Sequence, residues 1–363
     1  MKIVVVLPSI QGGGAEYVGL TWARELAARG HNVTLALSAP PEPGAAPPEL
    51  GIVLMRGGGL VRKSRSLARL IKKSQPDIVL SLMPFFNIMA LTARLQTPSS
   101  IPVKVIISGR NVDRLSRKHL GLSGRVQELI AKALYRYCDG YVAISHPVAA
   151  EAISHYGIPQ DKTVVVRNPA MGKVSEPGAL QPRSAEASKH LSIVVPARLV
   201  AQKRPLLAVD IAAWLRDQGI TARVHYFGAG PLLKEIQIYG ARRDVDIEMH
   251  GSPGDWFERI PVNSVVVLPS YTEGFGNVLV EATALGFPVV AYSGALGVAD
   301  AVIHGVTGLL VDIDRVETWG ASVLKASTIQ PPYLSEWLLG FSIDESTDAL
   351  ERVLIHFNRG EDA

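Results

Sequence analysis

Two glutamates, Glu273 and Glu281, have the side-chain type and spacing to bind a polar, elongated ligand. Glu273 precedes Gly274 and Gly276 in a loop that follows an apolar run, and Glu281 lies in the helical pattern after that loop. Such a loop favours an anion such as a diphosphate, because backbone N–H groups and the positive end of the helix dipole point there. A carboxylate about two turns inside the helix, roughly 12 Å along, can reach another part of the ligand. Two solvated glutamates at a strand–helix turn are the alternative.

Two cations, Arg198 and Lys203, follow a second apolar run and precede a helical pattern at residues 206–218. Fixed cations at the carboxyl edge of a sheet are what a departing diphosphate requires. A third strand-like run leads to three glycines, of which Gly13 and Gly14 could let the backbone approach the diphosphate. The alternatives are solvated surface cations and an ordinary strand–helix turn.

The elements that must position these residues form two α/β series. Residues 1–170 alternate apolar, β-branched runs with helical patterns, and residues 191–332 do the same. This alternation is typical of parallel sheets with both faces covered. Residues 171–190 lose the pattern and are predicted to be a linker, and residues 333–363 have helical spacing. The predicted strands span residues 3–7, 32–37, 52–54, 78–82, 104–107, 140–144 and 163–167, and then 192–195, 223–227, 247–250, 264–268, 289–291 and 309–311.

Five stretches occur in the order and at the spacing of a known family. They are Gly13-Gly-Ala-Glu16, Arg198-Leu-Val-Ala-Gln-Lys203, Phe227-Gly-Ala-Gly-Pro231, Leu268-Pro-Ser-Tyr-Thr-Glu-Gly-Phe-Gly276 and Gly286-Phe-Pro-Val-Val290. Together they resemble glycosyltransferase family 4 on the GT-B fold, over nearly the whole chain. The resemblance implies an α/β protein of two Rossmann-like domains facing across a cleft, with the last helices returning to the N-terminal domain.

The resemblance also implies roles for the donor-side residues. Arg198 and Lys203 would carry the diphosphate of a nucleotide sugar, Glu273 would contact a sugar hydroxyl, and Glu281 would bind the ribose hydroxyls. Arg198, Lys203 and Glu273 are therefore the predicted catalytic residues. Further donor contacts are predicted from Gly13, Gly14, Gly251, Pro253, Gly274, Phe275, Gly276, Asn277 and Val278.

The acceptor side departs from the family pattern. Many members carry a histidine or a carboxylate after the strand at 104–107, whereas this chain has Ser108-Gly-Arg-Asn-Val-Asp113. Arg110 and Asn111 match part of the family loop and would either orient a phosphate or cap the loop. Asn87 is also predicted to face the cleft.

By resemblance, the reaction is a retaining transfer of a hexosyl group, in which the leaving phosphate accepts the acceptor's proton. No Asp-x-Asp metal-binding motif occurs at the donor loops, so we predict a metal-independent enzyme without a cofactor. As a separate prediction, the donor is a UDP-sugar rather than a GDP-sugar. The alternatives are a GT-B sugar-nucleotide epimerase and a non-catalytic nucleotide-sugar-binding module. Nicotinamide binding is excluded, because Tyr17 stands where a Rossmann fingerprint needs its third glycine.

The 363 residues carry a net charge of +4, divided unevenly between the two halves. Residues 1–180 hold 22 Lys/Arg and 11 Asp/Glu, a balance of +11, and residues 181–363 hold 15 and 22, a balance of −7. Such asymmetry indicates different partners for each half. The basic side chains recur at helical spacing, which suits an anionic membrane or a lipid diphosphate acceptor, or else a solvated helix face. They are Arg62, Arg65, Arg69 and Lys72, with a second cluster of Arg114, Arg117, Lys118 and Arg125.

Other partners and compartments follow from what the sequence lacks. Nucleic acid is not expected, since its binding motifs and interleaved aromatics are absent. The single cysteine, Cys138, is predicted to be a core residue, and it excludes an intramolecular disulfide framework. The first apolar run, residues 3–7, is too short for a secretory signal. We therefore expect a cytoplasmic enzyme of bacterial surface or lipid-linked polysaccharide assembly, peripheral on the inner face of the cell membrane.

Overall fold

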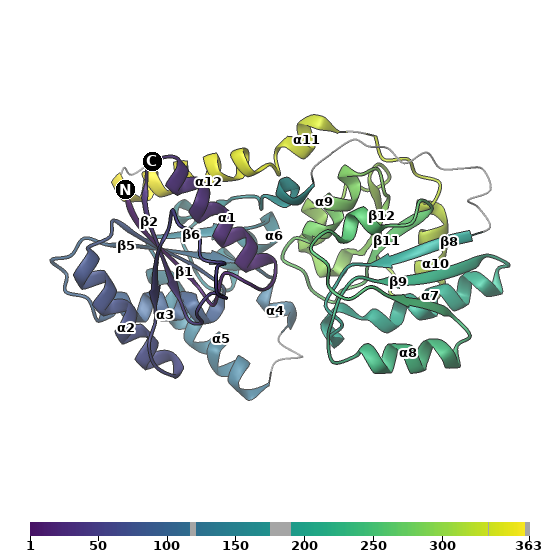
Figure 1. The fold of residues 1–363 in the computed structure, drawn as a ribbon, viewed down its shortest axis with the longest axis horizontal. Helices are drawn as coiled ribbons and strands as arrows, with labels where there is room; N and C mark the ends of the chain where they lie inside the picture. Colours follow the sequence, from purple (N-terminus) through teal and green to yellow (C-terminus); the bar gives the residue numbers. More distant parts are fainter. Residues whose placement is uncertain (117–120, 175–189, 333, 360–363) are drawn as a thin grey trace. The chain divides into compact units, whose positions relative to one another are not determined.

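The computed structural model describes residues 1–116, 121–174, 190–332 and 334–359, and it divides the chain into two units (Figure 1). Unit 1 contains residues 1–169 and the residues from 340 onward, and unit 2 contains residues 170–339. Of the predicted linker at 171–190, the structure describes only 171–174 and 190. Residues 171–173 belong to a 3₁₀ helix, Ala170–Lys173, and His190 begins a strand. The other linker residues lie outside the described part.

Unit 1 is built on a seven-stranded parallel sheet with the order β3-β2-β1-β4-β5-β6-β7. Its strands are runs of Val, Ile and Leu, and β1 buries Ile3 to Leu7 almost completely, as expected of a parallel sheet covered on both faces. All seven predicted strands are found, with each end within two residues of its predicted place. The strands are β1 (Lys2–Leu7), β2 (Asn32–Leu37), β3 (Gly51–Leu54), β4 (Ile78–Leu82), β5 (Lys104–Gly109), β6 (Gly140–Ala143) and β7 (Thr163–Val165).

The helices of unit 1 follow its strands in alternation. Pro84 occupies the first turn of α3, where its missing N–H costs no hydrogen bond. Ser145 caps α6 by accepting a hydrogen bond from the backbone N–H of Val148. The described helices that follow the strands are α1 (Gly14–Ala28), α2 (Gly59–Ser74), α3 (Pro84–Leu95), α4 (Asp113–Ser116), α5 (Leu122–Leu134) and α6 (His146–Ser154).

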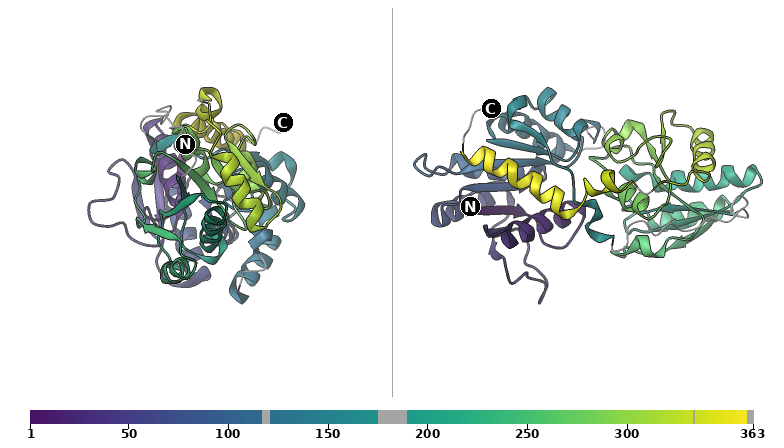
Figure 2. Two further views of the ribbon diagram at one scale, coloured as in Figure 1. Left: turned by 90° about the vertical axis from the view of Figure 1, so that its right-hand side faces the viewer. Right: turned by 90° about the horizontal axis from the view of Figure 1, so that it is seen from above.

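A helix from the end of the chain completes the core of unit 1. Helix α12 (Ile343–Arg359) lies alongside α1 and buries Leu350 and Leu354 in the same apolar cluster as β1 (Figure 2). Phe357 lies against β6 at Gly140, where a Cβ atom would stand 2.5 Å from the phenyl ring. The glycine thus makes room for the aromatic ring, and residues more than 200 positions apart share one core.

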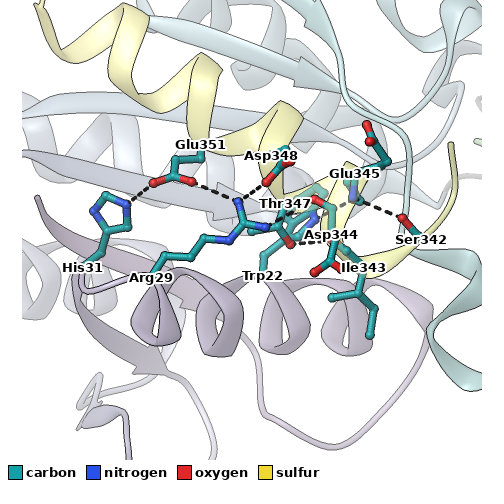
Figure 3. A network of polar contacts seen from close by, with 11 residues as sticks. Trp22, Arg29, His31, Ser342, Ile343, Asp344, Glu345, Thr347, Asp348 and Glu351 are labelled. Carbon is teal, nitrogen blue, oxygen red and sulfur yellow. Dashed lines mark hydrogen bonds and ion pairs between the residues drawn. The ribbon is translucent and has the colours of Figure 1, made fainter. Parts of the chain in front are cut away.

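Polar contacts fix the same helix in place (Figure 3). The indole N–H of Trp22 donates to Ser346 Oγ at 2.9 Å, and this hydroxyl donates to the carbonyl oxygen of Arg167 at 2.6 Å. Glu351 accepts from Arg29 at 3.0 Å and lies 2.6 Å from His31 Nε2. The contact with His31 contributes most to holding the pKa of Glu351 below its usual value. The buried bond from Trp22 sets the register of α12 against α1.

Unit 2 is a second parallel sheet, with six strands in the order β10-β9-β8-β11-β12-β13. The order reverses between β8 and β11, so the chain leaves these neighbouring strands toward opposite halves of the sheet. Such a switch point opens a crevice outside the carboxyl ends of the strands. The strands are β8 (His190–Val195), β9 (Thr221–Tyr226), β10 (Asp246–Met249), β11 (Ser264–Leu268), β12 (Val289–Tyr292) and β13 (Gly308–Val311). The described helices are α7 (Pro205–Asp217), α8 (Leu233–Arg242), α9 (Asn277–Ala284), α10 (Val316–Ala326) and α11 (Ser335–Leu339).

Candidate active site

The loops after β8 and β11 lie side by side at the switch point of unit 2. Gln202 joins them, since its backbone carbonyl accepts from the N–H of Tyr271 at 3.0 Å. Its side-chain amide donates to the carbonyl oxygen of Thr272 at 3.1 Å. The two loops therefore form one platform. The sequence analysis did not single out Gln202, because a glutamine between two cations carries no distinctive signal.

Lys203 and Glu273, predicted from separate motifs, form an ion pair on this platform. Glu273 Oε1 also accepts a hydrogen bond of 2.6 Å from Ser270 Oγ, and the residue is only 9% exposed. One carboxylate oxygen thus holds both a hydroxyl and an ammonium group. The arrangement positions the Lys203 ammonium at the carboxyl edge of the sheet, where an incoming phosphate would compete for its remaining N–H donors.

Arg198 is exposed, and its guanidinium has no hydrogen bond or ion pair with the part of the chain that the structure describes. Its loop is packed tightly against the loop after β9. A Cβ atom at Gly228 would lie 1.9 Å from the carbonyl oxygen of Ala197, and one at Gly230 would lie 2.4 Å from that of Leu199. The Phe227-Gly-Ala-Gly-Pro231 motif therefore serves to hold the Arg198 backbone, which leaves an unpaired cation on a fixed support.

The glycine-rich loop after β11 reaches α9 through a left-handed residue. Gly276 has φ +95° and caps α9, which begins at Asn277. Gly274 and Phe275 are buried, and Asn277 and Val278 are partly exposed at the first turn. The N–H of Leu279 already donates to the carbonyl oxygen of Gly276 at 2.9 Å, and this N-terminus of α9 is the predicted anion-binding end.

Gly297 packs against the backbone of the same loop, and the sequence analysis did not select this glycine. A Cβ atom on Gly297 would stand 2.3 Å from the carbonyl carbon and oxygen of Gly274. Glu273 is also bridged to Leu296, with its N–H on the carbonyl oxygen of Ala295 at 3.2 Å. The backbone at 295–297 thus fixes the position of the loop that carries Glu273.

We expect Gly297→Ala to lower the affinity for nucleotide diphosphate by about tenfold, because the loop at Gly274 must shift to admit the methyl group. Gly58→Ala is the matched control, since no atom lies within 4 Å of its Cβ position and its φ of −91° suits any residue. Calorimetric titration measures both. Equal affinity for the Gly297 variant and the wild type would show that the loop does not bind donor.

Glu281 lies one turn into α9, rather than about two, because α9 begins at Asn277 and not earlier. It is 4% exposed and accepts a hydrogen bond of 2.8 Å from the indole N–H of Trp256. Burial raises the pKa of Glu281, against the opposing effects of Lys173 and of the Trp256 hydrogen bond. A buried carboxylate with one donor has lone pairs left for ligand hydroxyls.

The loop predicted to lie near the base follows β10. Gly251 has φ +70° and is exposed, and Pro253 is partly exposed. Trp256, which the sequence analysis did not select, comes directly after this loop and joins it to Glu281. His250, which follows the end of β10, stacks on Phe227 with ring centroids 4.2 Å apart. A tryptophan just beyond a polar loop was the available signal for Trp256.

Gly13 is the N-cap residue of α1 in unit 1, and Gly14 is the first residue of the helix. The backbone N–H of Gly13 already has a partner within the helix. The N–H of Gly13 donates to Glu16 Oε2 at 3.1 Å. A Cβ atom at Gly12 would lie 3.0 Å from the same carboxylate group. Because Glu16 occupies this helix end, it must move before a phosphate can bind there.

The acceptor-side residues of unit 1 have varied surroundings. Asn87 is 1% exposed, accepts from Ser81 Oγ at 2.8 Å and donates to the carbonyl oxygen of Ser108 at 2.9 Å. It therefore joins β4 to β5 inside the unit, and we assign it a structural role instead of the predicted cleft-facing one. Asn111 Oδ1 accepts a hydrogen bond from the N–H of Val112 at 2.9 Å. This contact corresponds to the loop-capping role that was one of its two predicted roles.

Arg110 is held between two side chains of unit 1. It donates to Asn168 Oδ1 at 2.7 Å, and its guanidinium carbon lies 5.3 Å from the centre of the Trp22 ring. Burial lowers the pKa of Arg110 to about 9, although Tyr141 and Glu16 oppose the shift. A partly desolvated cation at the end of β5 could still meet an anionic ligand.

Two carboxyl groups shape the loop after Arg110. Glu151 accepts from the N–H of Asp113 at 2.8 Å and from that of Arg114 at 2.7 Å. Asp113 accepts from Tyr156 Oη at 3.2 Å. Burial raises the pKa of Asp113 to about 6 and that of Glu151 to about 7. Asp113 is partly exposed and Glu151 is buried, so the two carboxyl groups and Tyr156 hold this loop from within unit 1.

Solved structures with this arrangement of two sheets define the fold as GT-B. The lipopolysaccharide outer core galactosyltransferase WaaB superposes with a TM-score of 0.75 at 18% identity, over 98% of this chain and 99% of that one. Anabaena Alr3699/HepE, solved in complex with UDP and glucose, gives a TM-score of 0.66 at 18% identity, over 99% and 98%. These likenesses establish the fold.

Family models identify the family. The Glycosyltransferase Family 4 model matches residues 12–170, and the Glycosyl transferases group 1 model matches residues 179–334. The chain therefore belongs to the family 4 type of glycosyltransferases. A D-inositol 3-phosphate glycosyltransferase of Arthrobacter sp. (strain FB24) is 35% identical over 211 residues, which is 53% of this chain and 48% of that protein. The chain thus spans about half the length of the curated relatives it matches.

Proposed function

We propose that this chain is a retaining glycosyltransferase that moves a hexosyl group from a nucleotide diphosphate sugar to a hydroxyl of a lipid-linked or surface-glycan acceptor. The observation that carries the proposal is the platform at the β8–β11 switch point. It combines the unpaired Arg198, the Lys203–Glu273 ion pair and the buried Glu281 beside one helix N-terminus. Cations for a diphosphate and carboxylates for hydroxyls are the groups that such a donor needs.

The proposed chemistry needs no nucleophile from the protein. As the bond between the sugar and the diphosphate breaks, negative charge grows on the leaving phosphate, and Arg198 and Lys203 stabilise it there. The leaving phosphate accepts the proton of the acceptor hydroxyl, which attacks the same face of the sugar. Glu273 orients the Lys203 ammonium and a sugar hydroxyl, and Glu281 binds the ribose. Because these cations neutralise the phosphate, transfer is proposed to proceed without a metal ion at the donor site.

A UDP-hexose is the proposed donor. It is supported by the solved structure of HepE, which contains UDP and glucose, and by that of WaaB, a galactosyltransferase. A D-inositol 3-phosphate glycosyltransferase and the galactosyltransferase WaaB are among the similar proteins, so neither the epimerase nor the binding-module alternative is favoured.

A panel of nucleotide sugars tests the proposal. We expect release of the nucleotide diphosphate from one UDP-hexose, faster with a polyprenyl diphosphate-linked glycan present, and unchanged by EDTA. Conversion of the donor to an epimer without acceptor would indicate the epimerase instead. Binding of every donor with no release would indicate the binding module, and a strict need for a divalent ion would contradict the role given to the cations.

A membrane-bound acceptor is supported by the charges of unit 1. Arg62, Arg65, Arg69 and Lys72 of α2 are exposed, and they have no ion-pair partners in the described part of the chain. Leu67 and Ile71 on the opposite face of α2 are fully buried. On α5, Val126 and Leu129 are 48% and 65% exposed beside the exposed Arg125. Arg117 and Lys118 lie outside the described residues. No described helix has the length and apolar character to cross a bilayer.

We expect the protein to sediment with anionic but not with neutral liposomes at low salt. Each basic residue near such a surface contributes on the order of 1 kcal/mol, screened by salt. Changing Arg62, Arg65, Arg69 and Lys72 to glutamate should abolish sedimentation and leave UDP binding intact, since unit 2 holds the donor platform. Lys234→Glu with Arg242→Glu on α8 is the control. Equal sedimentation with both kinds of liposome would favour a solvated helix face.

A further inference from the structure

A cluster of two histidines and one glutamate lies on strands β9 and β10 of unit 2, on the other side of the sheet order from β11. His225 belongs to β9, Glu248 to β10, and His250 follows the end of β10. Their nitrogen and carboxylate oxygen atoms all lie within 4.8 Å of one another. Neither the family resemblance nor the donor chemistry uses these residues.

The backbone fixes this grouping. His225 and Glu248 are register partners on adjacent parallel strands, so their side chains stand next to each other on one face. His250 is two residues beyond Glu248 and therefore points to the same face. Its N–H continues the ladder by donating to the carbonyl oxygen of Tyr226 at 3.0 Å. Stacking on Phe227 holds the imidazole plane.

The distances suit a single ion. His225 Nδ1 lies 3.1 Å from His250 Nε2 and 3.5 Å from Glu248 Oε2, and His250 Nε2 lies 3.7 Å from Glu248 Oε1. Ligand atoms that share one Zn²⁺ at bonds of about 2 Å stand roughly 3 to 4 Å apart, which is the range of these separations. Two imidazole nitrogens facing each other at 3.1 Å share at most one hydrogen, whereas a cation satisfies both lone pairs.

The surroundings of the cluster leave it open to an incoming ion. His225 and Glu248 line a hollow of about 500 Å³ that opens to solvent. The guanidinium of Arg223 could compete with a metal ion for the Glu248 carboxylate. It lies 2.6 Å from Asp246 but 3.7 Å from Glu248, so Asp246 is its main partner.

We propose that His225, Glu248 and His250 form a binding site for Zn²⁺ or a similar divalent transition metal. Two imidazoles and one carboxylate are ligands that zinc accepts, whereas Mg²⁺ prefers oxygen ligands alone. Strand β10 is the edge strand of the sheet, so the ion would tie it to β9. The role is structural and separate from the reaction proposed above.

Zinc titration of the metal-stripped full chain tests the site. We expect one Zn²⁺ per chain and a rise in melting temperature of about 5 °C at saturation, with no rise in Mg²⁺. Glu248→Gln and His250→Phe should weaken zinc binding by about 100-fold. The phenyl ring keeps the stack on Phe227, and the glutamine keeps the shape of the exposed glutamate, so both variants should fold.

Glu128→Gln is the matched control. Glu128 pairs with His155 at 3.1 Å in unit 1, but the described residues offer no third ligand there. This variant should bind zinc like the wild type. Zinc affinity unchanged in Glu248→Gln and His250→Phe would mean an adventitious ion elsewhere and would overturn the proposal, as would the absence of any thermal shift in the wild type. Release of nucleotide diphosphate should not differ between stripped and zinc-loaded protein, so the proposed transferase activity is judged separately.

Discussion

Replacing Lys203 by alanine is expected to slow sugar transfer by about 10² to 10³, the loss seen when one preorganised donor to a developing negative charge is removed. The ammonium stabilises charge that grows only as the diphosphate departs, so turnover should fall more than the affinity for donor. Arg198→Ala should show the same pattern. Steady-state rates at saturating donor, together with titrations of the donor, separate the two effects.

Stability needs its own control, because Lys203→Ala also leaves the Glu273 carboxylate, 9% exposed, without its cation. An unpaired buried charge destabilises a protein. Lys203→Met with Glu273→Gln removes both charges and keeps the side-chain volumes, so it should fold better than Lys203→Ala and remain slow. Lys234→Ala, an exposed lysine of α8, should behave as wild type. Turnover near the wild-type value in both Lys203 variants would show that Lys203 does not stabilise the leaving diphosphate.

Replacing Glu281 by alanine is expected to weaken the affinity for UDP by at least about tenfold. A hydrogen bond to a charged acceptor contributes roughly 1.5–3 kcal/mol, and each 1.4 kcal/mol is a factor of ten. Glu281→Gln should lose less, because the amide oxygen can still accept from Trp256 and from one ribose hydroxyl. Calorimetry with UDP measures both variants directly.

Trp256 provides a further comparison for the ribose assignment. Trp256→Phe keeps an aromatic ring but removes the indole N–H that lies 2.8 Å from Glu281. Its effect on UDP affinity should be smaller than that of Glu281→Ala, since the carboxylate remains. If Glu281→Ala and Glu281→Gln both bind UDP as tightly as the wild type does, the ribose lies elsewhere and Glu281 is a buried structural carboxylate.

The fold was predictable because its strands are continuous runs of β-branched residues. The central strands are buried on both faces, and the predicted ends of all the strands lie within two residues of those in the structure. Arg198, Lys203, Glu273 and Glu281 were selected because all four follow strands of a parallel sheet, where ligand-binding loops gather. The structure brings Lys203 and Glu273 together, and the donor-binding roles stay predictions.

Contacts between distant residues were not predictable from local patterns. The approach of Gly297 to Gly274 and the bond between Trp256 and Glu281 depend on how separate loops meet. Asn87 was misplaced for a different reason. Helix α3 begins at Pro84, so Asn87 is its fourth residue. Its side chain points into unit 1, where it accepts a hydrogen bond from Ser81 instead of facing solvent.

The position of α12 has a consequence for how the chain matures on the ribosome. Unit 2 is continuous in sequence, so its whole core is available once residue 339 has emerged. Unit 1 must wait, because Leu350, Leu354 and Phe357 complete the cluster that β1 began more than 300 residues earlier. We therefore expect the middle of the chain to acquire protease resistance before its beginning does. A stop codon before residue 343 should leave a folded unit 2 attached to a first half with an open core.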